Sequence, residues 1–270
     1  MIRRPIELLG ALLLCATAAA DAAAPDCSTK TRDALGAIHS RGTLRVAQTN
    51  DYRPFSYRDA AGSPTGIDSE LAKRLATELG VELVWIDTTW STLAEDLRND
   101  RYDIAMSGVS ITQDRAAIGC FSTPYFVTGK TALTRCAVQR RFDTVAAIDA
   151  ADVTVIVNRG GTNERFARDH LTRARIVVRD DNRSVFTALA AGEADLMITD
   201  AVEARIEAQA NPALCVAEPP PLFESVEKAY LIPQDPAFKA RIDAWLTRIR
   251  ASGALSATLD RFLPTAPERH

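Results

Sequence analysis

The strongest constraint on the fold is a repeated alternation of strand-like and helix-like segments. Residues 44–48, 81–87 and 102–110 have the composition of strands, the last running into a loop. Residues 69–79 and 92–98 lie between them and have apolar side chains at helical spacing. Because such alternation is typical of βα units, it favours an α/β fold with a mainly parallel sheet covered by helices.

The alternation begins again after residues 130–135, so the chain carries two α/β units in series. Residues 153–170 predict a strand, a glycine loop and a helix. The pattern then continues with strands at 174–180 and 194–200, helices at 184–192 and 202–210, a strand at 228–234 and helices within 236–263. A further short strand is predicted at 54–57.

Polar clusters follow the predicted strands of both units. They read "NDY", "TTW" and "SGVS" in the first unit and "NRGGTNE" and "TDA" in the second. Open α/β sheets bind ligands beyond the carboxyl ends of their strands. We therefore expect these five loops to surround one cleft between two lobes.

The first 24 residues predict a cleaved signal peptide. Arg3 and Arg4 precede an apolar run over 8–20, followed by small residues, and cleavage after Ala20 or Ala24 fits equally well. The run is too short to span a bilayer comfortably. The mature chain is therefore expected in the periplasm and free of the membrane, and its net charge of −3 gives no basic surface for nucleic acid.

Four cysteines remain after the signal is removed: Cys27, Cys120, Cys136 and Cys215. An even number in an oxidising compartment favours two disulfides, in any of three pairings, over four buried thiols. The chain has three histidines and no Cys-x-x-Cys motif. We therefore expect no metal site.

The stretch "MSGVSITQDR" is a candidate anion site. Ser107, Gly108 and Ser110 offer hydroxyl and backbone N–H donors, and the Arg115 guanidinium matches the geometry of a carboxylate. The alternative is that Arg115 is a solvated arginine at the start of a helix.

Two aromatic residues and one acid also follow strand ends. Tyr52 and Trp90 could hold a flat ligand between their rings, or belong to the core. Asp200 could accept a hydrogen bond from a ligand ammonium, or cap the helix that follows it.

The loop "GGTNE" predicts a second anion site. Its glycines allow a tight turn, and the free N–H groups of the helix that follows, with Thr162 and Asn163, form a cradle. It lacks the Lys-Ser/Thr of a phosphate-binding P-loop. Glu164 comes next, either as an ordinary first-turn acid favoured by the helix dipole or as a functional carboxyl.

Taken in order, "RGTLRVAQTNDYRPFSY", "GIDSELAKRLATELG", "DIAMSGVSITQDR", "FSTPY", "GGTN" and "ADLMITDA" resemble the periplasmic solute-binding proteins for polar amino acids. The resemblance covers nearly all of the mature chain. It implies two α/β lobes joined by two hinge strands and closing over a ligand. Lobe 1 would comprise residues 25–132 and 226–270, and lobe 2 residues 133–225.

The same resemblance implies roles for individual residues. Arg115 would clamp the ligand α-carboxylate, Tyr52 and Trp90 would flank its side chain, and Asp200 would take the α-amino group. The loop with Thr162 would give further donors.

More narrowly, "AMSGVSITQDR", "IVNRGGTNERFAR", "DNRSVFTALAAGEADLMITDAVEAR" and "EKAYLIPQD" resemble the periplasmic cyclohexadienyl dehydratases. These are lyases on the solute-binding fold that convert prephenate to phenylpyruvate and L-arogenate to L-phenylalanine. The resemblance implies no cofactor. It also implies a bond between Cys136 and Cys215, so that Cys27 and Cys120 are expected to form the other.

In that reaction Glu164 would be the general acid, protonating the leaving hydroxyl. Burial by closure of the lobes is expected to raise its pKa. Arg115 would hold the side-chain carboxylate of the substrate, and Ser110, Thr162 and Asn163 would add hydrogen bonds.

Lys130 and Lys228, near the two hinges, could each hold the second substrate carboxylate or lie at the surface. The alternative function is a non-catalytic binding protein for a polar amino acid, feeding an ABC importer. The sequence leaves open the choice between prephenate and arogenate, and whether the chain forms a homo-oligomer.

Overall fold

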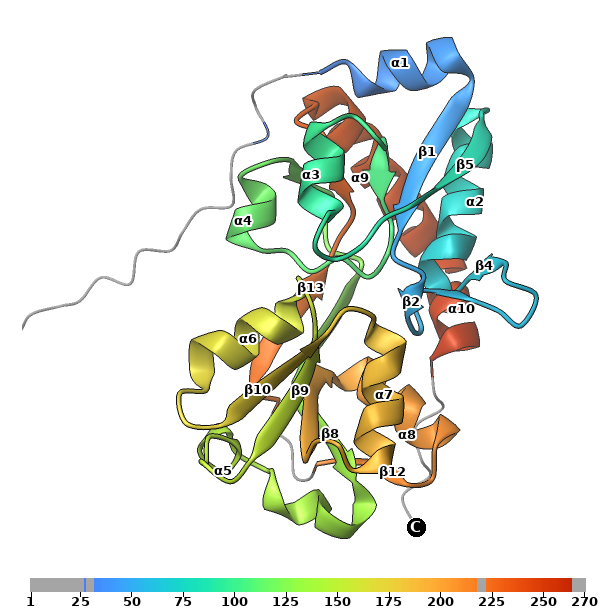
Figure 1. Cartoon of the computed structure of the whole chain (residues 1–270). Helices are drawn as coiled ribbons and strands as arrows, with labels where there is room; N and C mark the ends of the chain where they lie inside the picture. Colours follow the sequence, from blue (N-terminus) through green and yellow to red (C-terminus); the bar gives the residue numbers. More distant parts are fainter. Residues whose placement is uncertain (1–26, 28–31, 218–221, 264–270) are drawn as a thin grey trace, which may run out of the picture.

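The computed structural model describes residues 27, 32–217 and 222–263. The predicted signal peptide, residues 1–24, lies outside the described residues. The chain forms two α/β lobes, one above the other in Figure 1, with the N-terminal and C-terminal helices both in the upper one. We call the upper body lobe 1 and the lower body lobe 2.

Lobe 1 is built on a five-stranded sheet. Its order is β5 (Glu82–Asp87), β1 (Thr43–Gln48), β6 (Ile104–Ala105), β14 (Leu231–Ile232) and β7 (Cys120–Phe121). The first three strands are parallel, and β14 is antiparallel to both of its neighbours. The apolar side chains of β1 are fully buried because helices cover both faces of the sheet.

Helix α2 (Ile67–Leu79) shows how the sequence specifies the helices of lobe 1. Its apolar side chains recur at helical spacing and are buried against the sheet, and Gly80 ends it with the positive φ of 68° that glycine tolerates. The other elements of lobe 1 are α1 (Ala34–Arg41), α3 (Leu93–Arg98), α4 (Gln113–Ala116), α9 (Pro236–Ala251), α10 (Ala254–Phe262), β2 (Asp51–Tyr52), β3 (Ser56–Arg58) and β4 (Pro64–Thr65).

Asp235 joins the two ends of the chain within lobe 1. One of its oxygens caps α9 by accepting from Ala237 and Phe238, and the other accepts from the Ala34 N–H at the start of α1, 2.8 Å away. Because this carboxylate is fully buried, it fixes the N-terminal helix on the C-terminal one.

Lobe 2 is built on a second sheet of order β10 (Arg175–Arg179), β9 (Thr154–Asn158), β11 (Leu196–Asp200), β8 (Phe126–Arg135) and β12 (Leu214–Val216). The first three strands are parallel, and β8 is antiparallel to β11 and β12. The helices are α5 (Val145–Ile148), α6 (Thr162–His170), α7 (Asn182–Ala191) and α8 (Ala201–Ala210), with a 3₁₀ segment at Cys136–Arg141.

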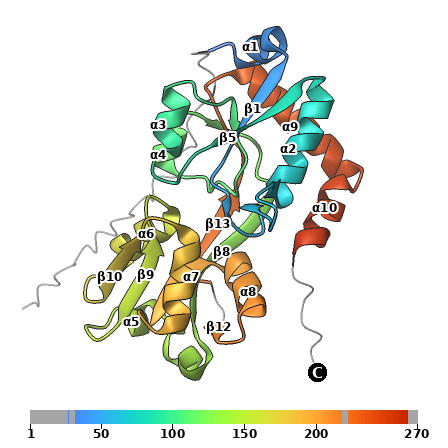
Figure 2. The same cartoon turned by 45° about the vertical axis from the view of Figure 1, so that its right-hand side comes forward.

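Two strands cross between the lobes. β8 pairs with β13 (Glu224–Lys228) in antiparallel register, with Glu224 opposite Lys130 and Lys228 opposite Phe126. Figure 2 shows them side by side at the waist of the molecule. The expected lobe boundaries, 132/133 and 225/226, lie within these two strands.

The alternation of strands and helices predicted from the sequence is confirmed, with three local differences. The strand expected at 54–57 is displaced to β3, after a cis Arg53–Pro54 bond. The segment 102–110, expected as a strand running into a loop, is paired over Ile104–Ala105, and the residues after that pair form the expected loop. The long strand β8 was not predicted, since a buried lysine and Gly129 disrupt its apolar pattern.

Each lobe carries one disulfide. Cys27 is bonded to Cys120 in lobe 1, and Cys136 to Cys215 in lobe 2, as expected from the resemblance. Within the described ranges, no helix is both long and apolar enough to cross a bilayer.

Replacing Cys136 and Cys215 together by alanine should lower the free energy of unfolding by roughly 2–4 kcal/mol, because the bond closes a long loop. The separation is 79 residues. The three tryptophans all lie in lobe 1. Denaturant unfolding should therefore be followed by circular dichroism for both lobes and by tryptophan fluorescence for lobe 1. An unchanged circular dichroism midpoint would contradict the prediction, and the Cys27/Cys120 double alanine variant is the matched control.

Candidate functional site

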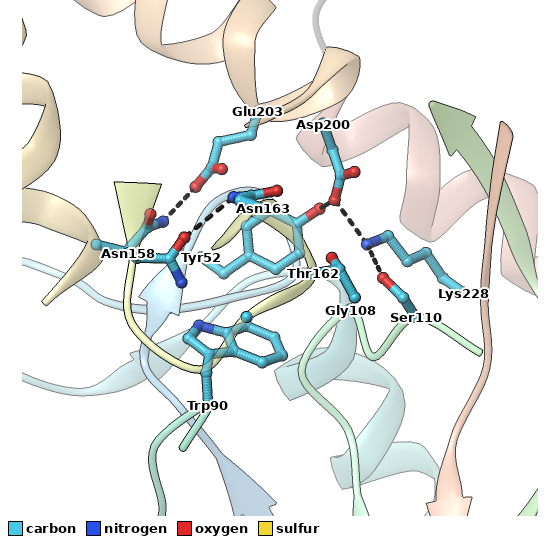
Figure 3. A pocket seen from close by; sticks show the side chains of 12 residues that line it. Tyr52, Trp90, Gly108, Ser110, Asn158, Thr162, Asn163, Asp200, Glu203 and Lys228 are labelled. Carbon is cyan, nitrogen blue, oxygen red and sulfur yellow. Dashed lines mark hydrogen bonds and ion pairs between the residues drawn. The ribbon is translucent and has the colours of Figure 1, made fainter. Parts of the chain in front are cut away.

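A narrow pocket lies between the lobes, where the carboxyl ends of strands from both sheets meet (Figure 3). Lobe 1 and the crossing strand β13 contribute Tyr52, Trp90, Gly108, Ser110 and Lys228. Lobe 2 contributes Asn158, Gly161, Thr162, Asn163, Asn182, Asp200 and Glu203.

Gly108 forms part of the wall on the side of lobe 1. It has a φ of +63°, and a Cβ here would come within 2.6 Å of the Tyr52 and Phe55 rings. Its N–H donates to Asp68 over 2.5 Å, which holds the loop in place from behind. Burial raises the pKa of Asp68 to about 7, although the Gly108 N–H and the Tyr125 hydroxyl partly oppose this.

The aromatic pair lies on the same wall but is not a parallel sandwich. The Tyr52 and Trp90 rings are 5.8 Å apart and meet edge to face. The Trp90 indole N–H donates to Asp51 over 3.1 Å, and the Tyr52 hydroxyl donates to Asp200 of lobe 2. Both rings line the cavity, and Tyr52 also connects the lobes.

Two lysines from the crossing strands converge on Asp200. The Nζ of Lys130 in β8 is 2.9 Å from one carboxylate oxygen, and the Nζ of Lys228 in β13 is 2.7 Å from the other. Each lysine is 1% exposed, so the surface alternative is excluded for both. Asp200 ends β11 and directly precedes α8, but its side chain makes no capping hydrogen bond, so the capping alternative is wrong as well.

The two lysines stabilise the ionised form of Asp200. Burial alone would raise the pKa of Asp200, but Lys130 and Lys228 outweigh it and hold that pKa well below its usual value. Burial lowers the pKa of Lys228 to about 8, with Asp200 opposing the shift. At neutral pH Asp200 is therefore an ionised carboxylate, with one lysine bonded to each of its oxygens.

The glycine loop reaches the same group. Thr162 and Asn163 accept hydrogen bonds from the Lys130 ammonium over 2.9 and 2.5 Å. The Asn163 amide donates to Asn158 at the end of β9. The side-chain oxygens of this loop thus position a cation at the base of the cavity, while the turn places Gly161 in its wall.

Glu164 lies in the first turn of α6 and does not line the cavity. One oxygen accepts from the Gly160 N–H over 2.7 Å, and the other pairs with Arg168 over 2.8 Å; the side chain is 14% exposed. Burial would raise its pKa, but the Gly160 N–H and Arg168 outweigh it and hold the pKa below the usual value. The expected rise in this pKa is therefore wrong for this arrangement, and the helix dipole favours the charged form too.

The anion site expected in "MSGVSITQDR" is only partly assembled. Ser110 lines the cavity and accepts from Lys228, and Arg115 donates to the Ser110 carbonyl over 3.1 Å and lies 5.6 Å from the Trp90 ring centre. Burial lowers the pKa of Arg115 to about 10, so it stays charged at neutral pH. Ser107 does not line the pocket. Its hydroxyl instead bonds to Thr49 within lobe 1.

Three lining residues were not among those singled out in the sequence: Asn158, Asn182 and Glu203. Asn182 donates to Glu203 over 2.7 Å and to the Asp51 carbonyl of lobe 1 over 3.1 Å. Burial raises the pKa of Glu203 well above its usual value, and the neighbouring Asp200 adds to the rise. The strand-end rule could have found them, since Asn158 ends β9, Asn182 follows β10 and Glu203 lies one turn after β11.

Comparison with known proteins shows which family and which relatives this chain resembles. Residues 44–265 match the bacterial extracellular solute-binding proteins, family 3. A cyclohexadienyl dehydratase from Pseudomonas aeruginosa is 48% identical over 236 residues, which is 86% of this chain and 88% of that protein.

Two solved structures have similar folds. An ancestral amino acid-binding protein, described as a precursor of cyclohexadienyl dehydratase, is 33% identical with a TM-score of 0.80, over 85% of this chain and 99% of that one. An ancestral cyclohexadienyl dehydratase is 42% identical with a TM-score of 0.53, over 87% and 98%. The chain therefore belongs to the family 3 bacterial extracellular solute-binding proteins.

Proposed function

We propose that this chain is a cyclohexadienyl dehydratase. The observation that carries the proposal is the 48% identity, over most of both chains, to a dehydratase of that name. A cluster of cationic side chains supports it as well: Lys228 lines the pocket, and Lys130 and Arg115 lie close enough to lower its pKa. A cleft of this charge suits a substrate with two carboxylates.

The reaction would remove the ring hydroxyl and ring carboxylate of prephenate together. The bond between the ring and its carboxylate breaks, CO₂ leaves, and the bonding electron pair enters the ring. The C–O bond breaks as the hydroxyl takes a proton and leaves as water. The aromatic ring of phenylpyruvate results, or that of L-phenylalanine when L-arogenate reacts.

Glu164 is the residue we propose as the proton donor. To donate, its carboxyl must give up the bonds to Gly160 and Arg168 and become protonated. A bound dianion nearby would favour this, because a negative charge raises the pKa of an adjacent acid. Exclusion of water by the closed lobes would also raise the pKa of Glu164.

The other roles concern binding. Arg115 and the two lysines would hold the substrate carboxylates, with Ser110, Thr162 and Asn163 as hydrogen-bond partners. Tyr52, Trp90 and the backbone of Gly108 would contact the ring, and Ser107 would support their loop from within lobe 1. The family is extracellular, and together with the predicted signal peptide this supports a periplasmic location, which we propose for this chain.

A non-catalytic amino acid-binding role is the rival function. The 0.80 TM-score to an ancestral amino acid-binding protein favours it, as does the ionised state of Glu164 in this structure. The two functions differ in whether prephenate is consumed.

The purified mature chain should convert prephenate to phenylpyruvate at neutral pH, and Glu164→Gln should lower kcat by roughly 10²–10⁴-fold, the usual contribution of a general acid. Product is measured by the absorbance of phenylpyruvate in alkali. Glu193→Gln is the matched control, because Glu193 also pairs with an arginine of lobe 2 but lies at the surface. Absence of product from the wild-type chain, with tight binding of an amino acid, would favour the rival function.

Arg168→Gln should move the alkaline limb of the kcat profile to higher pH. Arg168 favours the charged form of Glu164, so its removal raises the Glu164 pKa. Since the acid must be protonated to act, activity would then persist to a higher pH. An alkaline limb at the same pH in both proteins would argue against Glu164 as the titrating acid.

A further inference from the structure

One buried oxygen belonging to the wall of the pocket has no hydrogen-bond donor. Within residues 27, 32–217 and 222–263, the buried side-chain atoms that lack a partner are Asn50 Oδ1, Arg179 Nε and Asn182 Oδ1. Of these three residues, Asn182 alone lines the pocket. A buried acceptor without a donor destabilises the protein that contains it. Such an acceptor on a pocket-lining residue indicates a donor that arrives with the ligand.

The neighbours of Asn182 fix which of its two terminal atoms is the oxygen. Its Nδ2 donates to the Asp51 carbonyl oxygen over 3.1 Å and to Glu203 over 2.7 Å. A backbone carbonyl can only accept, so the atom that faces Asp51 must be the nitrogen. Both amide hydrogens are then used, and turning the amide over would break the bond to lobe 1. The oxygen therefore remains an acceptor of fixed direction.

The backbone holds this acceptor in place as well. Asn182 is the first residue of α7 and is 2% exposed. The helix is capped by Asp181, whose side chain accepts from the N–H groups of Arg183 and Ser184. The Asn182 oxygen is thus carried by a regular element, which limits the part of a ligand that it can reach.

Asn182 lies away from the two buried lysines. The strands of lobe 2 run in the order β10, β9, β11 and β8, and Asn182 follows β10 whereas Lys130 lies on β8. Lys228 lies on β13, which pairs with β8. Figure 3 shows Glu203, which bonds to Asn182, on the other side of the pocket from Lys228. A ligand held at the lysines by its carboxylates would therefore present its opposite end to Asn182.

Prephenate and arogenate both have the matching arrangement of groups. One carboxylate is attached directly to a ring carbon, and the other belongs to the side chain on that same carbon. The hydroxyl is on the carbon across the ring. With the carboxylates at the lysines, the ring hydroxyl is the donor at the far end, whereas the ammonium of arogenate stays beside its carboxylate.

We propose that the Asn182 side-chain oxygen accepts a hydrogen bond from the ring hydroxyl of the substrate, the group that leaves as water. The hydroxyl hydrogen then points at Asn182, and a lone pair on the hydroxyl oxygen is left for the proton from the acid. As that proton is added and the C–O bond breaks, positive charge on the oxygen strengthens its bond to Asn182. An interaction that is stronger in the transition state accelerates the reaction. The proposal rests on the dehydratase function proposed above.

Asn182→Leu should lower kcat/KM by about tenfold or more for prephenate and for arogenate alike, because both carry the hydroxyl. The affinity for phenylpyruvate, measured by calorimetry, should stay unchanged, because this product has lost the hydroxyl. Asn211→Leu is the matched control. Asn211 follows the last residue of α8 in lobe 2, lies outside the pocket, and its oxygen already accepts from the Ala213 N–H.

An unchanged kcat/KM in Asn182→Leu would overturn the proposal. A loss confined to arogenate would also overturn it, since the donor would then be the ammonium. Weaker phenylpyruvate binding, in proportion to the loss of kcat/KM, would indicate a merely structural role through the lost contact with Asp51. If Asn182→Leu does not fold, Asn182→Ala is compared in the same way.

Binding separates failure of this proposal from failure of the proposed function. If the wild-type chain consumes neither substrate, the dehydratase function fails, and calorimetry can then be applied to prephenate itself. Asn182→Leu should still weaken the binding of prephenate by about tenfold and leave that of phenylpyruvate unchanged. Equal effects on the two ligands, or none on prephenate, would overturn the role of Asn182.

Discussion

The bond between Asp200 and two buried lysines is the interaction on which the arrangement of the lobes depends. Asp200 ends a strand of lobe 2, and the lysines lie on the two strands that cross between the lobes. Removing one partner from a buried ion pair typically costs about 3–5 kcal/mol, because a charge is left uncompensated. Here each oxygen of Asp200 bonds to one lysine, and Lys228 also lines the pocket. The same residues thus bear on stability and on the binding of a ligand.

The two sides of the cleft are built with different degrees of rigidity. On lobe 1, Gly108 has no room for a side chain and is held by Asp68, itself bonded to Tyr125. On lobe 2, side chains provide several of the bonds to the glycine loop: Lys130 bonds to Thr162 and Asn163, and Glu164 accepts from the Gly160 N–H. A wall fixed by backbone contacts maintains its shape, whereas a loop bonded through side chains can exchange those bonds for bonds to a ligand. The lobe 2 loop is therefore the side better suited to rearrange around a substrate.

Most of the helices and strands could be predicted from the sequence, because the periodicity of apolar residues depends only on neighbouring positions in the chain. Strands and helices alternate visibly, and the strand-end rule placed the polar loops around one cleft. The exceptions are residues whose environment is set by distant parts of the chain. Lys130 looked like a candidate surface residue because lysine is rarely buried, and its partner Asp200 lies 70 positions away. Glu203 was missed for a similar reason, since an acid in the first turn of a helix has an ordinary explanation.

Glu164 shows where a sequence motif and a structure give different information. The motif and the family resemblance assign it a chemical role, whereas the structure shows a carboxylate stabilised by Gly160 and Arg168. Both can hold if these bonds exist before the substrate arrives and are replaced by contacts to it. A carboxylate that begins with a depressed pKa must then gain its proton during binding. The Arg168 contact is partly exposed, so it is the weaker of the two restraints and would be given up first. The acid would in this way become available only when a ligand of the right charge occupies the cleft.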